Sequence, residues 1–97
     1  MVTGHSLGGA LASLFSLYLK EKTKDSDITL ITFGQPRVGD STYAHVHDSM
    51  IPPHRKLRFV YRYDIMPHFP SAHARPEYRH HSREVWVYKR WHAKVPC

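Results

Sequence analysis

The feature that most constrains this chain is a short glycine-rich turn near its start, Gly4-His5-Ser6-Leu7-Gly8. It fits the Gly-x-Ser-x-Gly pattern, in which a strand turns sharply into a helix and holds a serine hydroxyl clear of a sheet. The serine of such a turn takes a strained backbone conformation, so we expect Gly4 and Gly8 to provide room for it. The pattern makes Ser6 a candidate nucleophile. The Leu7 N–H, at the start of the helix, is a candidate donor to an oxyanion.

An apolar segment follows this turn and predicts the helix that the pattern requires. Residues 7–20 carry large apolar side chains at i, i+4, i+7, i+8 and i+11, a spacing typical of a helix with one buried face. The face that we expect to pack against a sheet consists of Leu7, Leu11, Leu14, Phe15 and Tyr18. Only residues 1–3 precede Gly4, so the strand before the turn is expected to be cut short.

The rest of the chain predicts further strands and a second helix. Residues 28–33 are β-branched and aromatic, which is typical of a buried strand, and one helix between two strands implies that the strands are parallel. Asp40 is expected to cap a helix over residues 41–49, although a catalytic role for this acid stays open. Residues 55–63 and 84–88 predict two more strands. The fold class is therefore α/β, with parallel strands and crossover helices.

Asp64 is the candidate partner acid. It directly follows the strand over residues 55–63. An acid at the carboxyl end of a strand adjoining the nucleophile's strand can serve as the second member of a Ser-Asp-His triad. The alternative is an Asp that caps the turn before Pro67. The residues by themselves leave both open.

The charge of the chain is uneven, because residues 1–51 hold four Lys/Arg against five Asp/Glu, whereas residues 52–97 hold ten against three. A basic half can bind nucleic acid or an anionic membrane surface. Here the charges alternate with aromatic residues and form no helical stripe, so we expect a solvated surface and no nucleic-acid partner. No apolar run approaches the roughly 18 residues of a membrane span.

Metal-ligating patterns are weak in this sequence. Asp25 and Asp27 lie in a polar turn, where solvated acids are expected. Four histidines of the last third lack the spacing of a zinc site and are expected at the surface: His68, His73, His80 and His81. Cys97, the only cysteine, has no partner for an internal disulfide.

Three segments, residues 2–12, 32–40 and 63–70, resemble in order and spacing the class 3 (fungal-type) triacylglycerol lipases. Residues 80–86 are similar to animal and nematode members. The resemblance implies an α/β-hydrolase fold, here partial and truncated at both ends, with residues 1–97 a fragment of a single domain. It also implies hydrolysis of acylglycerol or other lipid esters, a lipid–water interface as partner, and an extracellular location. It implies neither a cofactor nor a metal.

The resemblance makes Ser6 the nucleophile and Asp64 the triad acid, and leaves Asp40 outside the triad. The family's catalytic histidine lies downstream of the strand over residues 84–88. His92 follows that strand, but its surroundings do not match the family's histidine segment. We therefore expect the chain alone to be nearly inactive and, with three strands of a larger sheet, marginally stable. The alternative is a non-catalytic lipase-like module whose basic surface binds anionic lipid.

Overall fold

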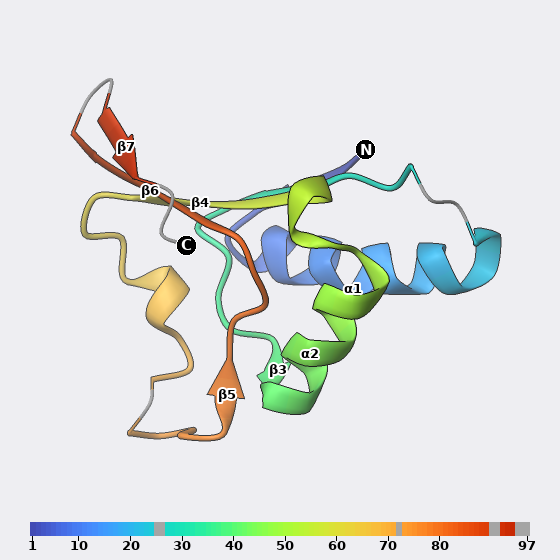
Figure 1. Cartoon of the computed structure of the whole chain (residues 1–97). Helices are drawn as coiled ribbons and strands as arrows, with labels where there is room; N and C mark the ends of the chain where they lie inside the picture. Colours follow the sequence, from blue (N-terminus) through green and yellow to red (C-terminus); the bar gives the residue numbers. More distant parts are fainter. Residues whose placement is uncertain (25–26, 72, 90–91, 95–97) are drawn as a thin grey trace.

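A computed structural model describes residues 1–24, 27–71, 73–89 and 92–94 of the chain (Figure 1). Cys97 and Asp25 lie outside these residues. The two α-helices are α1 (Leu7–Thr23) and α2 (Ser41–Met50), and two 3-10 turns are η1 (Pro53–Arg55) and η2 (Met66–His68). The strands are β1 (Val2–His5), β2 (Leu30–Phe33), β3 (Gly39–Asp40), β4 (Lys56–Tyr61), β5 (Tyr78–Arg79), β6 (Glu84–Lys89) and β7 (His92–Lys94).

A five-stranded sheet in the order β1-β2-β4-β6-β7 forms the centre of the molecule. The pairs β1–β2, β2–β4 and β4–β6 are parallel, and only β7 runs antiparallel to its neighbour β6. This confirms the predicted α/β class and the parallel crossovers. The expectation of a three-strand remnant was wrong, because the short β1 and the hairpin strand β7 extend the sheet on both sides. Strands β3 and β5 form a separate two-stranded sheet.

Helices α1 and α2 lie on the same side of the sheet (Figure 1). The side of α1 that is buried carries only small residues: Gly9, Ala10, Ala12, Ser13 and Ser16. The backbones approach so closely that a Cβ added at Gly9 would lie 3.2 Å from the Gln35 Cβ. A face of small side chains is what such a close approach admits.

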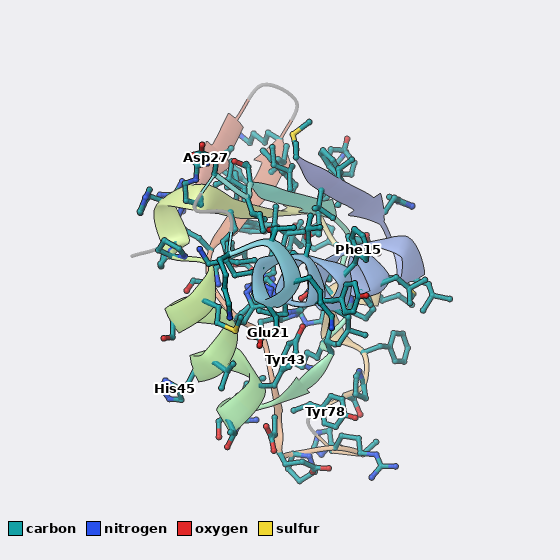
Figure 2. The ribbon with its side chains drawn as sticks, turned by 90° about the vertical axis from the view of Figure 1, so that its right-hand side faces the viewer. Phe15, Glu21, Asp27, Tyr43, His45 and Tyr78 are labelled. Atoms are coloured by element: carbon teal, nitrogen blue, oxygen red, sulfur yellow. The ribbon has the colours of Figure 1, made fainter. Side chains whose placement is uncertain are left out.

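The large apolar face of α1 is therefore exposed, and the prediction that it packs against the sheet was wrong. Leu7 is 67% exposed and Tyr18 58%. Figure 2 shows Phe15 on the side of α1 that faces away from α2. A stripe of apolar residues indicates which face avoids water, but packing distance decides which face meets a sheet. Among the described residues, neither helix has the length and apolar character of a membrane span.

Helix α2 begins as the sequence predicts. The Asp40 side chain accepts a hydrogen bond from the Tyr43 N–H at 2.9 Å, which is the geometry of an N-cap. This hydrogen bond gives Asp40 the structural role of a helix cap, which was the first of its two predicted interpretations.

Strand β4 places charged residues on its buried side. Lys56 and Arg58 alternate with Leu57 and Phe59, and the two charged side chains are 1% and 6% exposed. The expectation that the basic half is solvated was therefore wrong for these two residues. On the opposite side of the sheet, Phe33 stacks on Phe59 with ring centroids 5.3 Å apart.

Candidate active site

Ser6 lies at the tip of the turn between β1 and α1, with φ 55° and ψ −123°. This is the left-handed side of φ space, which a residue with a Cβ occupies only under strain. The Ser6 N–H donates to the Phe33 carbonyl at 2.8 Å, and the Ser6 carbonyl accepts from the Gly9 N–H at 2.9 Å. Neighbouring backbone thus holds the half-buried Ser6 in this strained conformation at the strand–helix turn, as the Gly-x-Ser-x-Gly pattern predicts.

The two glycines of the motif play different parts. A Cβ at Gly4 would lie 2.1 Å from the Gly8 carbonyl oxygen, so the turn has no room for any other residue at position 4. A Cβ at Gly8 would meet nothing within 4 Å. The expectation that the glycines provide room for the turn holds for Gly4 and is wrong for Gly8. At Gly8 the carbonyl oxygen, not the missing side chain, limits the space at Gly4.

Leu7 is the first residue of α1, so its N–H has no acceptor within the helix. It adjoins Ser6 at the positive end of the helix dipole. This is the position that the sequence predicts for an oxyanion donor.

Asp64 lies just beyond the carboxyl end of β4 and combines both of its predicted interpretations. Its Oδ1 accepts the Met66 N–H at 3.0 Å and so caps the following turn. Its Oδ2 lies 2.8 Å from the point that a Cβ of Gly34 would occupy. Gly34 has φ +64°, so glycine both allows the turn after β2 and leaves space for the carboxylate. One oxygen of Asp64 is structural, and the other faces the sheet edge.

Ser6 and Asp64 lie at the same edge of the sheet, but the prediction that they follow adjoining strands was wrong. Strand β2 lies between β1 and β4, and Gly34 at the end of β2 lies beside Asp64. A cavity of about 230 Å³ at this edge is lined by His5, Phe33, Gly34, Phe59, Tyr61, Asp64 and Val87. It brings Asp64 next to His5 rather than to Ser6. Ser6 is not among the residues that line this cavity.

His92, the histidine after β6, belongs to β7, where it pairs with Lys89 of β6. Its side chain lies outside the described part of the structure.

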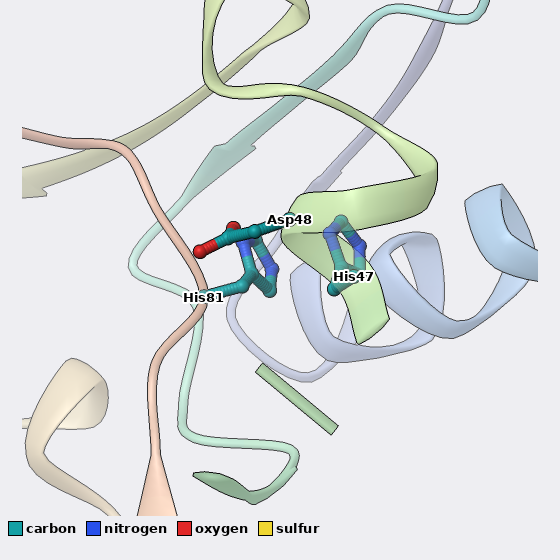
Figure 3. A group of neighbouring side chains, drawn as sticks. All are labelled: His47, Asp48 and His81. Atoms are coloured by element: carbon teal, nitrogen blue, oxygen red, sulfur yellow. The ribbon is translucent and has the colours of Figure 1, made fainter. Parts of the chain in front are cut away.

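The expectation of surface histidines holds for His68 and His73 and is wrong for His80 and His81. His81 is 1% exposed and lies parallel to the His47 ring at 3.8 Å between centroids (Figure 3). The His80 Nε2–H donates to the Pro67 carbonyl at 2.6 Å.

The hydrogen bonds around the two stacked rings assign their tautomers. The Lys56 ammonium donates to His47 Nδ1 at 2.8 Å, so His47 carries its proton on Nε2. His81 Nδ1 donates to the Ser82 carbonyl at 2.7 Å, so His81 Nε2 is the acceptor for the Gln35 amide at 3.1 Å. Both rings are therefore neutral in this network.

Burial lowers the pKa of His47 to about 3 and that of His81 to about 2. The positive charge of Lys56 acts in the same direction on both. Burial raises the pKa of Asp48, but hydrogen bonds from Lys56 and Ser82 outweigh it and hold that pKa below its usual value. The Lys56–Asp48 ion pair measures 2.6 Å.

This cluster invites comparison with a metal site, because ligand-type atoms of His47, Asp48 and His81 lie within 4.8 Å of one another. The ammonium of Lys56 already binds two of the three side chains and takes the position of the cation. The arrangement is that of an ion pair built into the core.

Ser13 and His81 form a second serine–histidine pair, with Ser13 Oγ 3.0 Å from His81 Nε2. Both residues are at most 1% exposed. A nucleophile must reach its substrate, so this pair is structural, and Ser6 remains the candidate.

Sequence reasoning missed this polar core because its members come from four separate segments. One signal was present in β4, where Lys56 and Arg58 occupy alternate positions. Residues two apart on a strand share a face, so two charges at that spacing point to a polar layer under the sheet.

Comparisons with known proteins agree with this geometry. The sequence model of the family "Lipase (class 3)" matches residues 1–74. The lipase of Rhizomucor miehei is 44% identical over 89% of this chain, and a lipase of Caenorhabditis elegans is 39% identical over 73%. The chain spans only 23% and 20% of the length of these two relatives.

Solved structures give the same result. The structure of Rhizomucor miehei triacylglyceride lipase matches 97% of this chain with a TM-score of 0.83 and 39% identity, and this chain covers 35% of it. A lipase from Rhizopus microsporus var. chinensis matches 96% of the chain with a TM-score of 0.82 and 37% identity, with 32% of that lipase covered. The fold is therefore a part of the α/β-hydrolase fold of these lipases, and the chain belongs to the class 3 lipase family.

Proposed function

We propose that residues 1–97 form the part of a lipase domain that carries the nucleophile and the acid, with Ser6 and Asp64 in these roles and carboxylic esters of acylglycerols as substrate. The single observation that carries the proposal is Ser6 at φ 55° on a strand–helix turn, at the same sheet edge as Asp64. The relatives bear lipase names, and one similar solved structure is described as a triacylglycerol lipase whose catalytic centre is a serine-protease triad.

The chemistry assigns a role to each group. A histidine removes the Ser6 proton, and Ser6 Oγ attacks the ester carbonyl. The Leu7 N–H stabilises the tetrahedral oxyanion, and the intermediate collapses to an acyl-enzyme with release of the alcohol. Water then attacks the acyl-enzyme by the same route and releases the fatty acid. Asp64 Oδ2 holds the histidine in its productive tautomer.

The described residues place no histidine against Ser6 Oγ, so the chain by itself is proposed to be inactive. Loss of the general base costs up to roughly 10⁶-fold in turnover. His5 lines the Asp64 cavity but belongs to β1 as the strand neighbour of Ser6. It therefore needs a control of its own.

The test is hydrolysis of p-nitrophenyl butyrate by the 97-residue chain and by a form extended through the complete reading frame, each with and without Ser6→Ala. We expect turnover only in the extended form, and its loss in Ser6→Ala. Esterase activity in the short chain that Ser6→Ala removes would contradict its proposed inactivity. His5→Gln and His92→Gln variants of the short chain would then identify the base.

A second candidate, a non-catalytic module that binds anionic lipid, rests on the basic half of the chain. Burial of Lys56 and Arg58 removes two of its positive charges from the surface and weakens this candidate. Salt-sensitive binding to phosphatidylserine vesicles, together with an inactive extended form, would favour it over the lipase.

A further inference from the structure

Arg37 ties the segment after Asp64 to the loop after β2. Its Nη1 donates to the His68 carbonyl at 2.8 Å and to the Pro70 carbonyl at 2.9 Å. Its backbone N–H donates to the Phe69 carbonyl at 2.6 Å. One residue thus binds three successive carbonyls of residues 68–70, which belong to no strand of the described structure.

The same segment is continuous with Asp64 through short-range hydrogen bonds. Asp64 Oδ1 accepts from the Met66 N–H, and the His68 N–H donates to the Ile65 carbonyl at 2.9 Å. The Phe69 N–H donates to the Met66 carbonyl at 3.0 Å. These bonds connect His68 and Phe69 to the turn that the Asp64 carboxylate caps.

The Asp64 carboxylate has little space around Oδ2, the oxygen that does not accept the Met66 N–H. Asp64 Oδ2 fits beside Gly34 only because no Cβ is there. Arg37 follows Gly34 by three residues, so its hydrogen bonds join the loop beside Asp64 Oδ2 to the segment that follows Asp64.

We infer that Arg37 is a positioning residue for the catalytic acid: it fastens residues 68–70 so that Asp64 Oδ2 keeps its orientation toward the histidine. This inference rests on the proposed function. Arg37 touches neither substrate nor the reacting atoms, and it acts through three carbonyls. A lysine at this position keeps the charge and a donor nitrogen but lacks the fixed planar geometry of the guanidinium.

The experiment uses the extended protein with Arg37→Met, Arg37→Lys and, as matched control, Arg75→Met. Arg75 is exposed and pairs with Glu77 at 3.8 Å. We expect Arg37→Met to lower kcat by about 10²-fold at nearly constant KM, as a misplaced catalytic group does. The acid limb of the kcat/KM profile should move to lower pH, because the histidine loses a fixed carboxylate that favours its charged form.

Arg37→Lys should lower kcat by less than Arg37→Met does, and Arg75→Met should have the kcat of the parent protein. A loss of kcat in Arg37→Met without movement of the acid limb, or activity equal to that of Arg75→Met, overturns the inference. If Arg37→Met does not fold, as judged by its thermal unfolding, Arg37→Lys decides by the same two readouts. An inactive parent, or one whose activity survives Ser6→Ala, instead refutes the proposed function.

Discussion

At the scale of single residues, the turn around Ser6 depends on backbone room rather than on side-chain contacts. Ser6 holds φ 55° because the backbone of β2 and α1 binds it on both sides. Gly4 of β1 lies against the first turn of α1, where an added Cβ would be 2.1 Å from the Gly8 carbonyl oxygen. The strain at the serine is thus stabilised by packing that one glycine makes possible.

Gly4→Ala and Gly8→Ala should therefore have opposite effects on the stability of this chain. Gly4→Ala should cost about 3 kcal/mol or more, because backbone must move to admit the methyl group. Gly8→Ala should stabilise by up to about 0.5 kcal/mol, because alanine is the better helix former and meets nothing within 4 Å. Urea unfolding followed by circular dichroism measures both. Equal losses in the two variants would contradict the different parts assigned to the two glycines.

At the scale of elements, the buried sides of α1 and α2 combine alanines with polar side chains. Ser13 of α1, His47 of α2 and Lys56 of β4 are all at most 1% exposed. Ser13 and His47 are both hydrogen-bonded to side chains of other segments, His47 to Lys56, so the network contributes to fixing the register of the helices on the sheet. The network requires both stacked histidines to be neutral, because His47 Nδ1 and His81 Nε2 act as hydrogen-bond acceptors.

The chain should for this reason lose stability in mild acid. His47 and His81 have folded-state pKa values of about 3 and about 2, below the 6.5 of an unfolded histidine. The unfolded state therefore binds protons first, and stability falls as pH drops from 6.5 toward 3. Each ring should contribute a loss of about 2 kcal/mol between pH 7 and pH 5. Asp48, with its lowered pKa, adds a further loss only below about pH 4.

Urea unfolding at pH 7, 6 and 5 measures this dependence. His81→Gln should reduce this dependence by about half, since glutamine does not titrate and His47 remains, whereas His45→Gln, at an exposed position of α2, is the control substitution away from the two rings. A parent whose free energy of unfolding is the same at pH 7 and pH 5 would show that the rings are not held neutral by the fold.

At the scale of the whole molecule, two apolar surfaces remain uncovered among the described residues. One is the outer face of α1, where Phe15 and Tyr18 stack at 6.1 Å between centroids. The other is the side of the sheet opposite the helices, where Tyr61 is 56% exposed. Parallel sheets are ordinarily covered on both faces, so this chain exposes surface that a complete domain of its class would bury.

The isolated chain should consequently bind the dye ANS and associate as its concentration rises. The double variant Leu11→Gln, Phe15→Gln should reduce both, with a change in stability within about 0.5 kcal/mol, because the two side chains are already exposed. Val46→Gln, at an exposed apolar position of α2, is the matched control. Sedimentation velocity at several concentrations and ANS fluorescence give the readouts. If Val46→Gln is as effective as the double variant, the α1 face is not the site of association.

Local patterns in the sequence were enough to predict much of this protein. The Gly-x-Ser-x-Gly turn, the Asp40 cap and the order of helices and strands depend on neighbours within a few residues, and the α/β class follows from that order. The roles of Ser6, Asp64 and Leu7 stay predictions that the proposed experiments test.

The tertiary structure alone decided what depends on distance between segments. The small-residue side of α1 meets the sheet because the backbones lie too close for leucine or phenylalanine. Lys56, His47 and His81 are buried because partners from other segments satisfy them, which no single stretch of sequence encodes. Arg37 reaches residues 68–70 across more than thirty positions for the same reason. Periodicity indicates which residues share a face, and only packing determines which face is covered.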